Sequence, residues 1–226
     1  MWIIYDPTFP LLMLAVIIGL IAHQRVKSTF VKYSRVPSSR RLTGAQVARM
    51  IAEQNGLDIR IERIGGNLTD HYDPRERVLR LSEPVYGSTS LAAIGVAAHE
   101  AGHAIQDAHG YVPMRIRHAL VPAANLGSQM LFPAIIGGFL FGLKPLIYIG
   151  IFLYFFAVLF SVVTLPVEFD ASRRALKTLA DSGYLVGREL DGAKKVLSAA
   201  AMTYVAAMLA SVINLLRLLI LARSSD

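Results

Sequence analysis

The sequence predicts a mainly α-helical integral membrane protein with about four transmembrane helices and a small α+β part outside the bilayer. Its 226 residues are 54% hydrophobic and 17% charged, whereas a soluble domain has about 25% charged residues. Four long stretches contain no charged side chain, and the last three reach the length of about 20 residues that a helix needs to cross the hydrocarbon core. These stretches are Pro7–Ala22, Ala119–Leu143, Pro145–Val167 and Val196–Leu216. The remaining polar sequence is too short to cover them in a soluble fold.

The first stretch is expected to be a retained membrane anchor. It lacks the basic segment that precedes the apolar core of a signal peptide, and Trp2 and Tyr5 are suited to the membrane interface. Basic residues follow the stretch instead: Arg25, Lys27, Lys32, Arg35, Arg40 and Arg41. Because basic residues beside a span mark the cytoplasmic side, residues 24–118 are expected in the cytoplasm. The net charge of +7 therefore reflects membrane topology and gives no indication of a nucleic-acid partner.

The alternation of apolar and polar sequence divides the chain into five parts. A bend at Leu143-Lys144 joins the second and third spans, so Glu168 is expected on the same side of the membrane as residues 24–118. The expected parts are a first transmembrane helix in 1–23, a cytoplasmic region in 24–118, a transmembrane helical hairpin in 119–167, a cytoplasmic helical segment in 168–195 and a last transmembrane helix in 196–222.

The cytoplasmic region is expected to contain a helix, a β-hairpin and a second helix. Residues Thr43–Gln46 fit a capping box that begins the first helix, and Asn55-Gly56 ends it. Apolar residues then alternate with charged ones over Leu57–Glu62 and again over Arg77–Leu81, a period typical of half-buried strands. The caps at Ser88–Ser90 precede a helix over Leu91–Ala108.

That second helix contains the sequence His99-Glu100-Ala101-Gly102-His103, an H-E-x-x-H motif. Residues four apart lie on one face of a helix, so His99 and His103 can reach one tetrahedral zinc ion. Zinc lowers the pKa of a bound water to about 7, and Glu100 is placed to take the proton of that water as the general base. The chain has no cysteine, so the other protein ligands must be histidines or carboxylates.

Three residues are candidates for the third zinc ligand. Glu168 follows the third span and faces the same side of the membrane as the motif helix. His109 has the spacing of an extended motif, but Gln106 replaces the glycine that would end the helix. His109 is then expected about 280° round the helix from His99, at 100° per residue, and so to point away from the site. Asp191 lies among charged residues, which favours a solvated loop. The sequence therefore favours His99, His103 and Glu168 as the ligands of one Zn²⁺ ion.

Three segments resemble those of a known family: Asp70–Pro74, Ala97–Gln106 and Glu168–Ser172. Over most of its length the chain resembles the YugP-like neutral zinc metallopeptidases of bacteria, and it is distantly similar to the HtpX-type membrane proteases. The resemblance implies an integral-membrane gluzincin with a zincin-like region, set in the bacterial inner membrane with its active site on the cytoplasmic side. In the HtpX group an aspartate four residues after the ligand glutamate orients a metal histidine. Ser172 stands there, so this support is either absent or supplied by another group.

The leading hypothesis is a zinc-dependent endopeptidase that hydrolyses peptide bonds of membrane or membrane-proximal proteins. A homo-oligomer or a regulatory membrane partner is left open. The alternative is a catalytically inactive, zinc-stabilised scaffold or regulatory subunit, which Glu100 disfavours because a structural site needs no general base. The strand at Arg77–Leu81 could add a peptide at its edge. The candidates for stabilising the oxyanion are His71, Tyr72, Tyr184 and Arg173.

Overall fold

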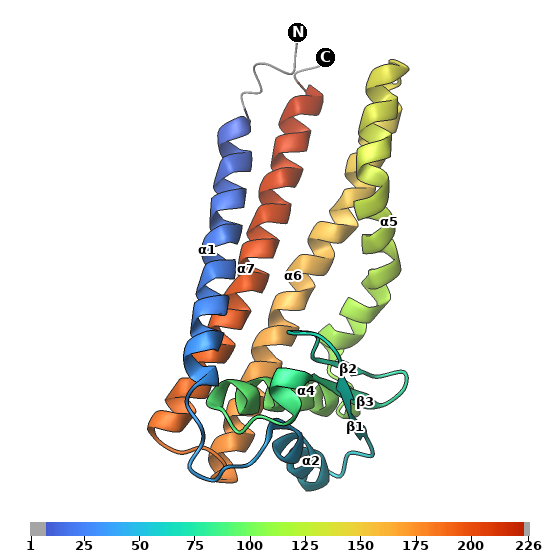
Figure 1. The fold of residues 1–226 in the computed structure, drawn as a ribbon. Coiled ribbons are helices and arrows are strands. Elements are labelled where there is room, and N and C mark those ends of the chain that lie inside the picture. The colour runs from blue at the N-terminus through green and yellow to red at the C-terminus, as the bar shows by residue number, and fades with distance from the viewer. Residues whose placement is uncertain (1–7, 224–226) are drawn as a thin grey trace. The chain divides into compact units, whose positions relative to one another are not determined.

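The computed structural model describes residues 8–223. Its helices are α1 (Phe9–Ser34), α2 (Gly44–Gln54), α3 (Glu83–Tyr86), α4 (Leu91–Ala108), α5 (Val112–Leu140), α6 (Lys144–Asp181) and α7 (Arg188–Arg223). Its strands are β1 (Arg60–Ile64), β2 (His71–Asp73) and β3 (Val78–Ser82). The prediction of a mainly helical fold with a small sheet is confirmed (Figure 1).

The long helices α1, α5, α6 and α7 are each long and apolar enough to cross a membrane, by length and composition. Among the described residues they contain the four stretches predicted as spans, apart from Thr8 at the start of the first and 141–143 at the end of the second. Pro7, Trp2 and Tyr5 lie outside the described residues. The helices extend beyond the uncharged stretches, since α1 continues to Ser34 and α6 runs without a break from Lys144 to Asp181.

The chain forms two compact units, to both of which these long helices contribute. The helical unit contains Met1–His23, Arg115–Leu165 and Thr203–Asp226, and the α+β unit contains Gln24–Met114 and Pro166–Met202. The residues predicted as a polar helical segment, 168–195, all lie in the α+β unit. They belong to the end of α6 and the beginning of α7, with a turn between them.

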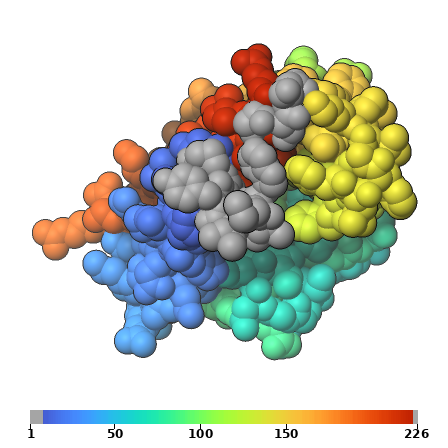
Figure 2. Space-filling view, turned by 90° about the horizontal axis from the view of Figure 1, so that it is seen from above, coloured from blue at the N-terminus to red at the C-terminus, as the bar shows by residue number. Residues whose placement is uncertain are grey.

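In the helical unit, α5 and α6 form a closely packed hairpin around residues 141–143. A β-carbon built on Gly127 would lie 2.0 Å from the carbonyl oxygen of Leu153, so only glycine permits this approach of the two helices. Figure 2 shows the side chains of this hairpin, in yellow and yellow-green, packed against one another. Ser161 and Ser211 join α6 to α7 through a hydrogen bond of 2.8 Å between their hydroxyl groups.

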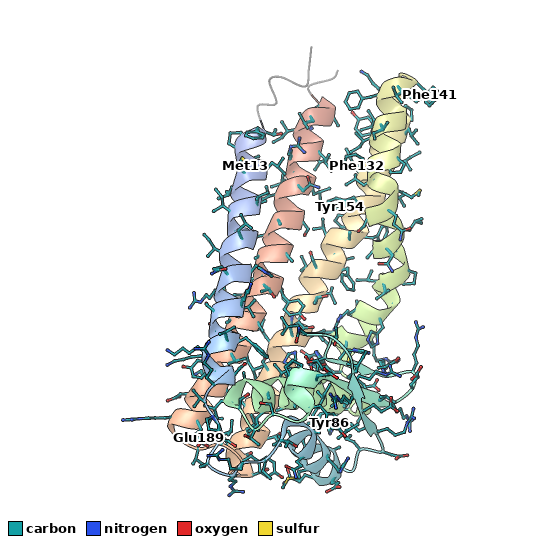
Figure 3. All side chains as sticks on the ribbon, in the orientation of Figure 1. Met13, Tyr86, Phe132, Phe141, Tyr154 and Glu189 are labelled. Carbon is teal, nitrogen blue, oxygen red and sulfur yellow. The ribbon has the colours of Figure 1, made fainter. Side chains whose placement is uncertain are left out.

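The surface of the helical unit is apolar. Phe132 and Phe141 are 72% and 74% exposed, and apolar side chains project along the full length of its helices (Figure 3). Exposed apolar surface on this scale marks a site of contact with a membrane or with another protein.

The α+β unit has a three-stranded sheet in the order β1-β3-β2. The two predicted strands were expected to form a hairpin, and this is wrong because β1 pairs with β3 in parallel. The antiparallel hairpin consists of β2 and β3, with Asp73 of β2 opposite Val78 of β3. The alternation of apolar residues reveals which strand face is buried but not which neighbour a strand pairs with, and β2 is too short to show a period. The prediction that a peptide could add at the edge of the strand Arg77–Leu81 is also wrong. This strand is β3, which lies in the middle of the sheet between β1 and β2.

Helix α4 lies at the centre of the α+β unit and is buried along most of its length. Its predicted bounds, Leu91–Ala108, are confirmed, and Ser90 caps it by accepting a hydrogen bond from the Ala93 N–H. The predicted capping box of α2 is also confirmed, with Thr43 and Gln46 bonding reciprocally. Helix α2 packs against the α3–α4 region so closely that a β-carbon on Gly44 would lie 2.4 Å from the carbonyl oxygen of Val85.

Candidate metal centre

The structure brings His99 and His103 of α4 together with Glu168 of α6. One possible ligand atom from each side chain lies within 4.8 Å of those of the other two. Nε2 of His99 is 3.2 Å from Oε2 of Glu168, and Nε2 of His103 is 3.7 Å from the same oxygen. The two imidazole rings stand edge to face with their centroids 4.7 Å apart, as expected for residues one helical turn apart.

These separations suit a tetrahedral zinc ion. Ligand atoms about 2.1 Å from such an ion lie roughly 3.4 Å from one another, and the two nitrogen–oxygen distances fall on either side of that value. Two neutral imidazoles and a carboxylate are also a donor set that zinc accepts. The residues present therefore fit the group that the motif predicts.

Charge compensation keeps the Glu168 carboxylate ionised although it is only 2% exposed. Burial alone would raise its pKa, but hydrogen bonds and the charges of His103 and His99 hold that pKa well below its ordinary value. The opposite holds for His103. Burial would lower the pKa of its ring, but the hydrogen bond to Glu168 and the negative charges of Glu100 and Glu168 raise it. Glu168 is thus in the form that binds a cation.

Glu100 follows His99 on α4 and is 9% exposed. Its negative charge contributes to the raised pKa of His103, which places the Glu100 carboxylate within electrostatic reach of the cluster. Among the described residues its carboxylate makes no hydrogen bond or ion pair. No described protein group therefore competes for the oxygen atoms of this carboxylate.

Gly102 allows the two helices that form the cluster to meet. A β-carbon at this position would lie 2.6 Å from the carbonyl oxygen of Ala171 on α6 and 3.2 Å from two further backbone atoms of Ala171. Backbone atoms cannot turn aside as a side chain can, so any larger residue would force α4 and α6 apart. Because His99 and His103 are on one helix and Glu168 is on the other, their convergence depends on this contact.

Each histidine has a partner on its other ring nitrogen, Nδ1. Ser172 Oγ lies 3.1 Å from Nδ1 of His99, and Gln106 Oε1 lies 3.0 Å from Nδ1 of His103. The position that the resemblance marked for an orienting aspartate is thus filled by a hydroxyl group that does contact a histidine. Gln106 was not among the predicted site residues, although it lies three residues after His103, on the same helix face.

The other two candidates for a metal ligand are not in the cluster. His109 ends α4 as its C-cap, and its Nδ1 lies 2.7 Å from the carbonyl oxygen of Ile105. Asp191 is exposed in the first turn of α7. The geometry therefore favours Glu168 over both.

The residues suggested for oxyanion stabilisation hydrogen-bond outside the cluster. Tyr184 is buried and accepts a hydrogen bond of 2.6 Å from Gln54. Tyr72 of β2 donates to Asp107 of α4 at 3.0 Å, and burial together with this negative partner raises the pKa of its hydroxyl group. The remaining contacts are those of His71 with the Thr69 carbonyl oxygen and of Arg173 with Asp170.

Comparison with known proteins agrees with this geometry. The family described as "Putative neutral zinc metallopeptidase" matches residues 8–223. The chain is 49% identical over 197 residues to the protein named "Putative membrane protease YugP" of Bacillus subtilis (strain 168), and the alignment covers 87% of this chain and 88% of that protein. No solved structure matches the chain.

The close approach at Gly102 yields a prediction with a control on the same helix. We expect Gly102→Ala to lower the free energy of unfolding by about 1–3 kcal/mol, the usual cost of overpacking, and to weaken zinc binding because the ligands separate. Gly95→Ala is the control, since a β-carbon there would meet Ala193 at an ordinary 3.6 Å. The measurements are thermal unfolding in detergent and zinc content. Wild-type values for Gly102→Ala in both would contradict the prediction.

Proposed function

The chain belongs to the family described as "Putative neutral zinc metallopeptidase", and on this premise we propose that it is a membrane-embedded, zinc-dependent endopeptidase. The observation that supports this proposal most directly is the convergence of His99, His103 and Glu168. We assign these three residues as the ligands of one zinc ion and Glu100 as the general base.

The proposed mechanism assigns each group a separate task. Zinc bound by the three ligands would polarise a peptide carbonyl group and lower the pKa of a water molecule to about 7. Glu100 accepts a proton from the attacking water, and its carboxylate can do so because it has no competing hydrogen-bond partner among the described residues. The proton then passes to the leaving amine, as required of a group that acts first as base and then as acid. His99 and His103 would hold the ion as neutral rings, and Glu168 would supply the negative charge.

The same features disfavour a purely structural zinc site. Structural zinc usually has four protein ligands and no open position, whereas the described residues bring together three such groups. A structural site would also have no use for a buried carboxylate at Glu100. The proposal of an enzyme therefore accounts for more of the observed arrangement than a scaffold does.

We further propose that the substrates are membrane or membrane-proximal proteins and that the site faces the cytoplasm of a bacterial cell. The relative from Bacillus subtilis carries the name "Putative membrane protease YugP", and four helices of this chain have the length and composition of spans. The sheet has an edge strand, β2, that contacts α4 through Tyr72 and Asp107. An extended peptide could add to this edge.

Two variants test the assignments of Glu100 and Glu168. We expect Glu100→Gln to keep one zinc per chain but to lower kcat about 100-fold or more, because general acid–base catalysis contributes 10²–10⁴ in rate. We expect Glu168→Ala to lose most of its zinc together with its activity. Zinc content and cleavage of a membrane-protein substrate would be measured on purified protein.

Glu53→Gln is a matched control, since it removes an exposed glutamate of α2 that is remote in sequence from the ligands. It should retain zinc and activity. Full activity in Glu100→Gln would exclude the general-base role, and unchanged zinc in Glu168→Ala would exclude Glu168 as a ligand.

The proposed topology can be tested by labelling, because the chain contains no cysteine. We expect Asn67→Cys, in the exposed loop after β1, to be protected from a membrane-impermeant maleimide in intact bacteria. We expect Leu143→Cys, between α5 and α6, to react, because the hairpin should place its bend outside the cell. The reverse pattern, or equal labelling of both in cells with intact membranes, would contradict a cytoplasmic site.

A further inference from the structure

Gln106 is fully buried and joins the two helices of the metal centre. It is 0% exposed, and its side chain makes three hydrogen bonds. Oε1 lies 3.0 Å from Nδ1 of His103, and Nε2 donates to the carbonyl oxygen of Val167 at 2.8 Å and to Oδ2 of Asp170 at 2.9 Å. A buried polar side chain so completely bonded holds one orientation.

The partners of Gln106 determine which way its amide group points. The Val167 carbonyl and the Asp170 carboxylate can only accept hydrogen bonds, so the amide nitrogen must face them. The reverse orientation would place the amide oxygen against two acceptor oxygens. Oε1 consequently faces His103 and can only accept, so Nδ1 of His103 must carry the proton in this hydrogen bond.

We propose that Gln106 is a positioning residue that holds His103 in the tautomer and ring orientation needed for binding a metal through Nε2. Because the partner of one ring nitrogen decides the role of the other, the proton on Nδ1 leaves Nε2, the nitrogen on the side of Glu168, as the one that can bind a metal ion. This inference rests on the proposed function, since it assumes that His103 is a ligand. It adds a residue outside the H-E-x-x-H motif and the assigned ligands.

The network extends from Gln106 to charged groups on α6. Asp170 is 6% exposed and binds the guanidinium groups of Arg173 and Arg174, which fix its carboxylate. Val167 directly precedes Glu168, so Gln106 bonds to the turn of α6 that carries the third proposed ligand. The same side chain thus orients one ligand and ties α4 to the turn that bears another.

His99 lacks an equivalent constraint. Its Nδ1 is bonded to Ser172, whose hydroxyl group can donate or accept and rotates to suit its partner. Ser172 therefore supports the His99 ring without selecting its tautomer. Of these two contacts, only the one between Gln106 and His103 selects a tautomer.

The first test compares Gln106→Met with the control Gln54→Met. Methionine has a similar length and no amide group, so His103 loses its acceptor while the space stays filled. We expect zinc affinity, measured by competition with a chelator, to fall about 10- to 100-fold, the usual effect of removing a partner of a ligand histidine. Gln54→Met also removes two side-chain hydrogen bonds, with Tyr184 and Ser182, and should bind zinc as the wild type does. Unchanged affinity in Gln106→Met, or an equal loss in Gln54→Met, would overturn the proposal.

A second test does not alter the residue that contacts His103. Asp170→Ala removes one hydrogen-bond acceptor of the Gln106 amide. We expect a loss of zinc affinity that is smaller than that of Gln106→Met. This loss should disappear when Asp170→Ala is made in the Gln106→Met variant, because Asp170 acts on His103 only through Gln106. In the Co²⁺-loaded protein, the exchangeable imidazole N–H signal of His103 should exchange faster with water in either single variant. An equal effect of Asp170→Ala in both backgrounds, or an unchanged N–H signal, would overturn the role of Gln106.

The wild-type titration separates this inference from the proposed function. If the wild type binds no zinc, the metal site itself is wrong. If the wild type binds zinc and the Gln106 variants bind it equally well, only the positioning role fails. Thermal unfolding of each variant in the presence of EDTA verifies that the metal-free proteins are folded before their affinities are compared.

Discussion

Glu168 carries an ionised carboxylate into the interior of the α+β unit, where it is 2% exposed. Removing such a charge from water costs several kcal/mol unless nearby groups compensate it. His99 and His103 provide that compensation from the facing helix, and Gly102 lets them come close enough to do so. Stability and the proposed metal binding therefore depend on the same contact between α4 and α6. Beside this contact, the buried side chain of Gln106 is bonded as fully as a buried site requires.

Helix α4 can lie at the centre of the α+β unit because many of its buried residues are small. Ala97, Ala98 and Ala101 are 0% exposed, so neighbouring elements approach almost to the backbone of the helix. A core of this kind is sensitive to any increase in volume, because its contacts are with main-chain atoms that cannot move independently. Close packing of this kind resists deformation, which suits a site whose proposed ligands must hold a fixed separation.

Local patterns in the sequence predicted the local features of the fold. The capping box at Thr43, the bounds of α4 and the four apolar helices each follow from signals within a short segment. Glu168 could be predicted to lie near the H-E-x-x-H motif, because the two apolar stretches before it form a hairpin that returns the chain to the same side of the membrane. The parallel pairing of β1 with β3 could not be predicted, since it depends on the three-residue strand β2 pairing with the opposite edge of β3. Gln106 escaped notice because its importance comes from Val167 and Asp170, some sixty residues further along the chain.

The brevity of β2 has a consequence for how a substrate is selected. A three-residue edge offers the N–H and C=O groups of only one or two residues to an incoming strand, because alternate residues point their hydrogen-bonding groups away from it. Main-chain pairing alone would then hold a freely diffusing peptide weakly. Few side chains of such a peptide would be held in place for recognition by pockets of the enzyme. A substrate confined to the same bilayer would instead be present at a high effective concentration, as in any tethered encounter. Such an enzyme would discriminate by where a protein resides more than by the residues that flank the cleaved bond.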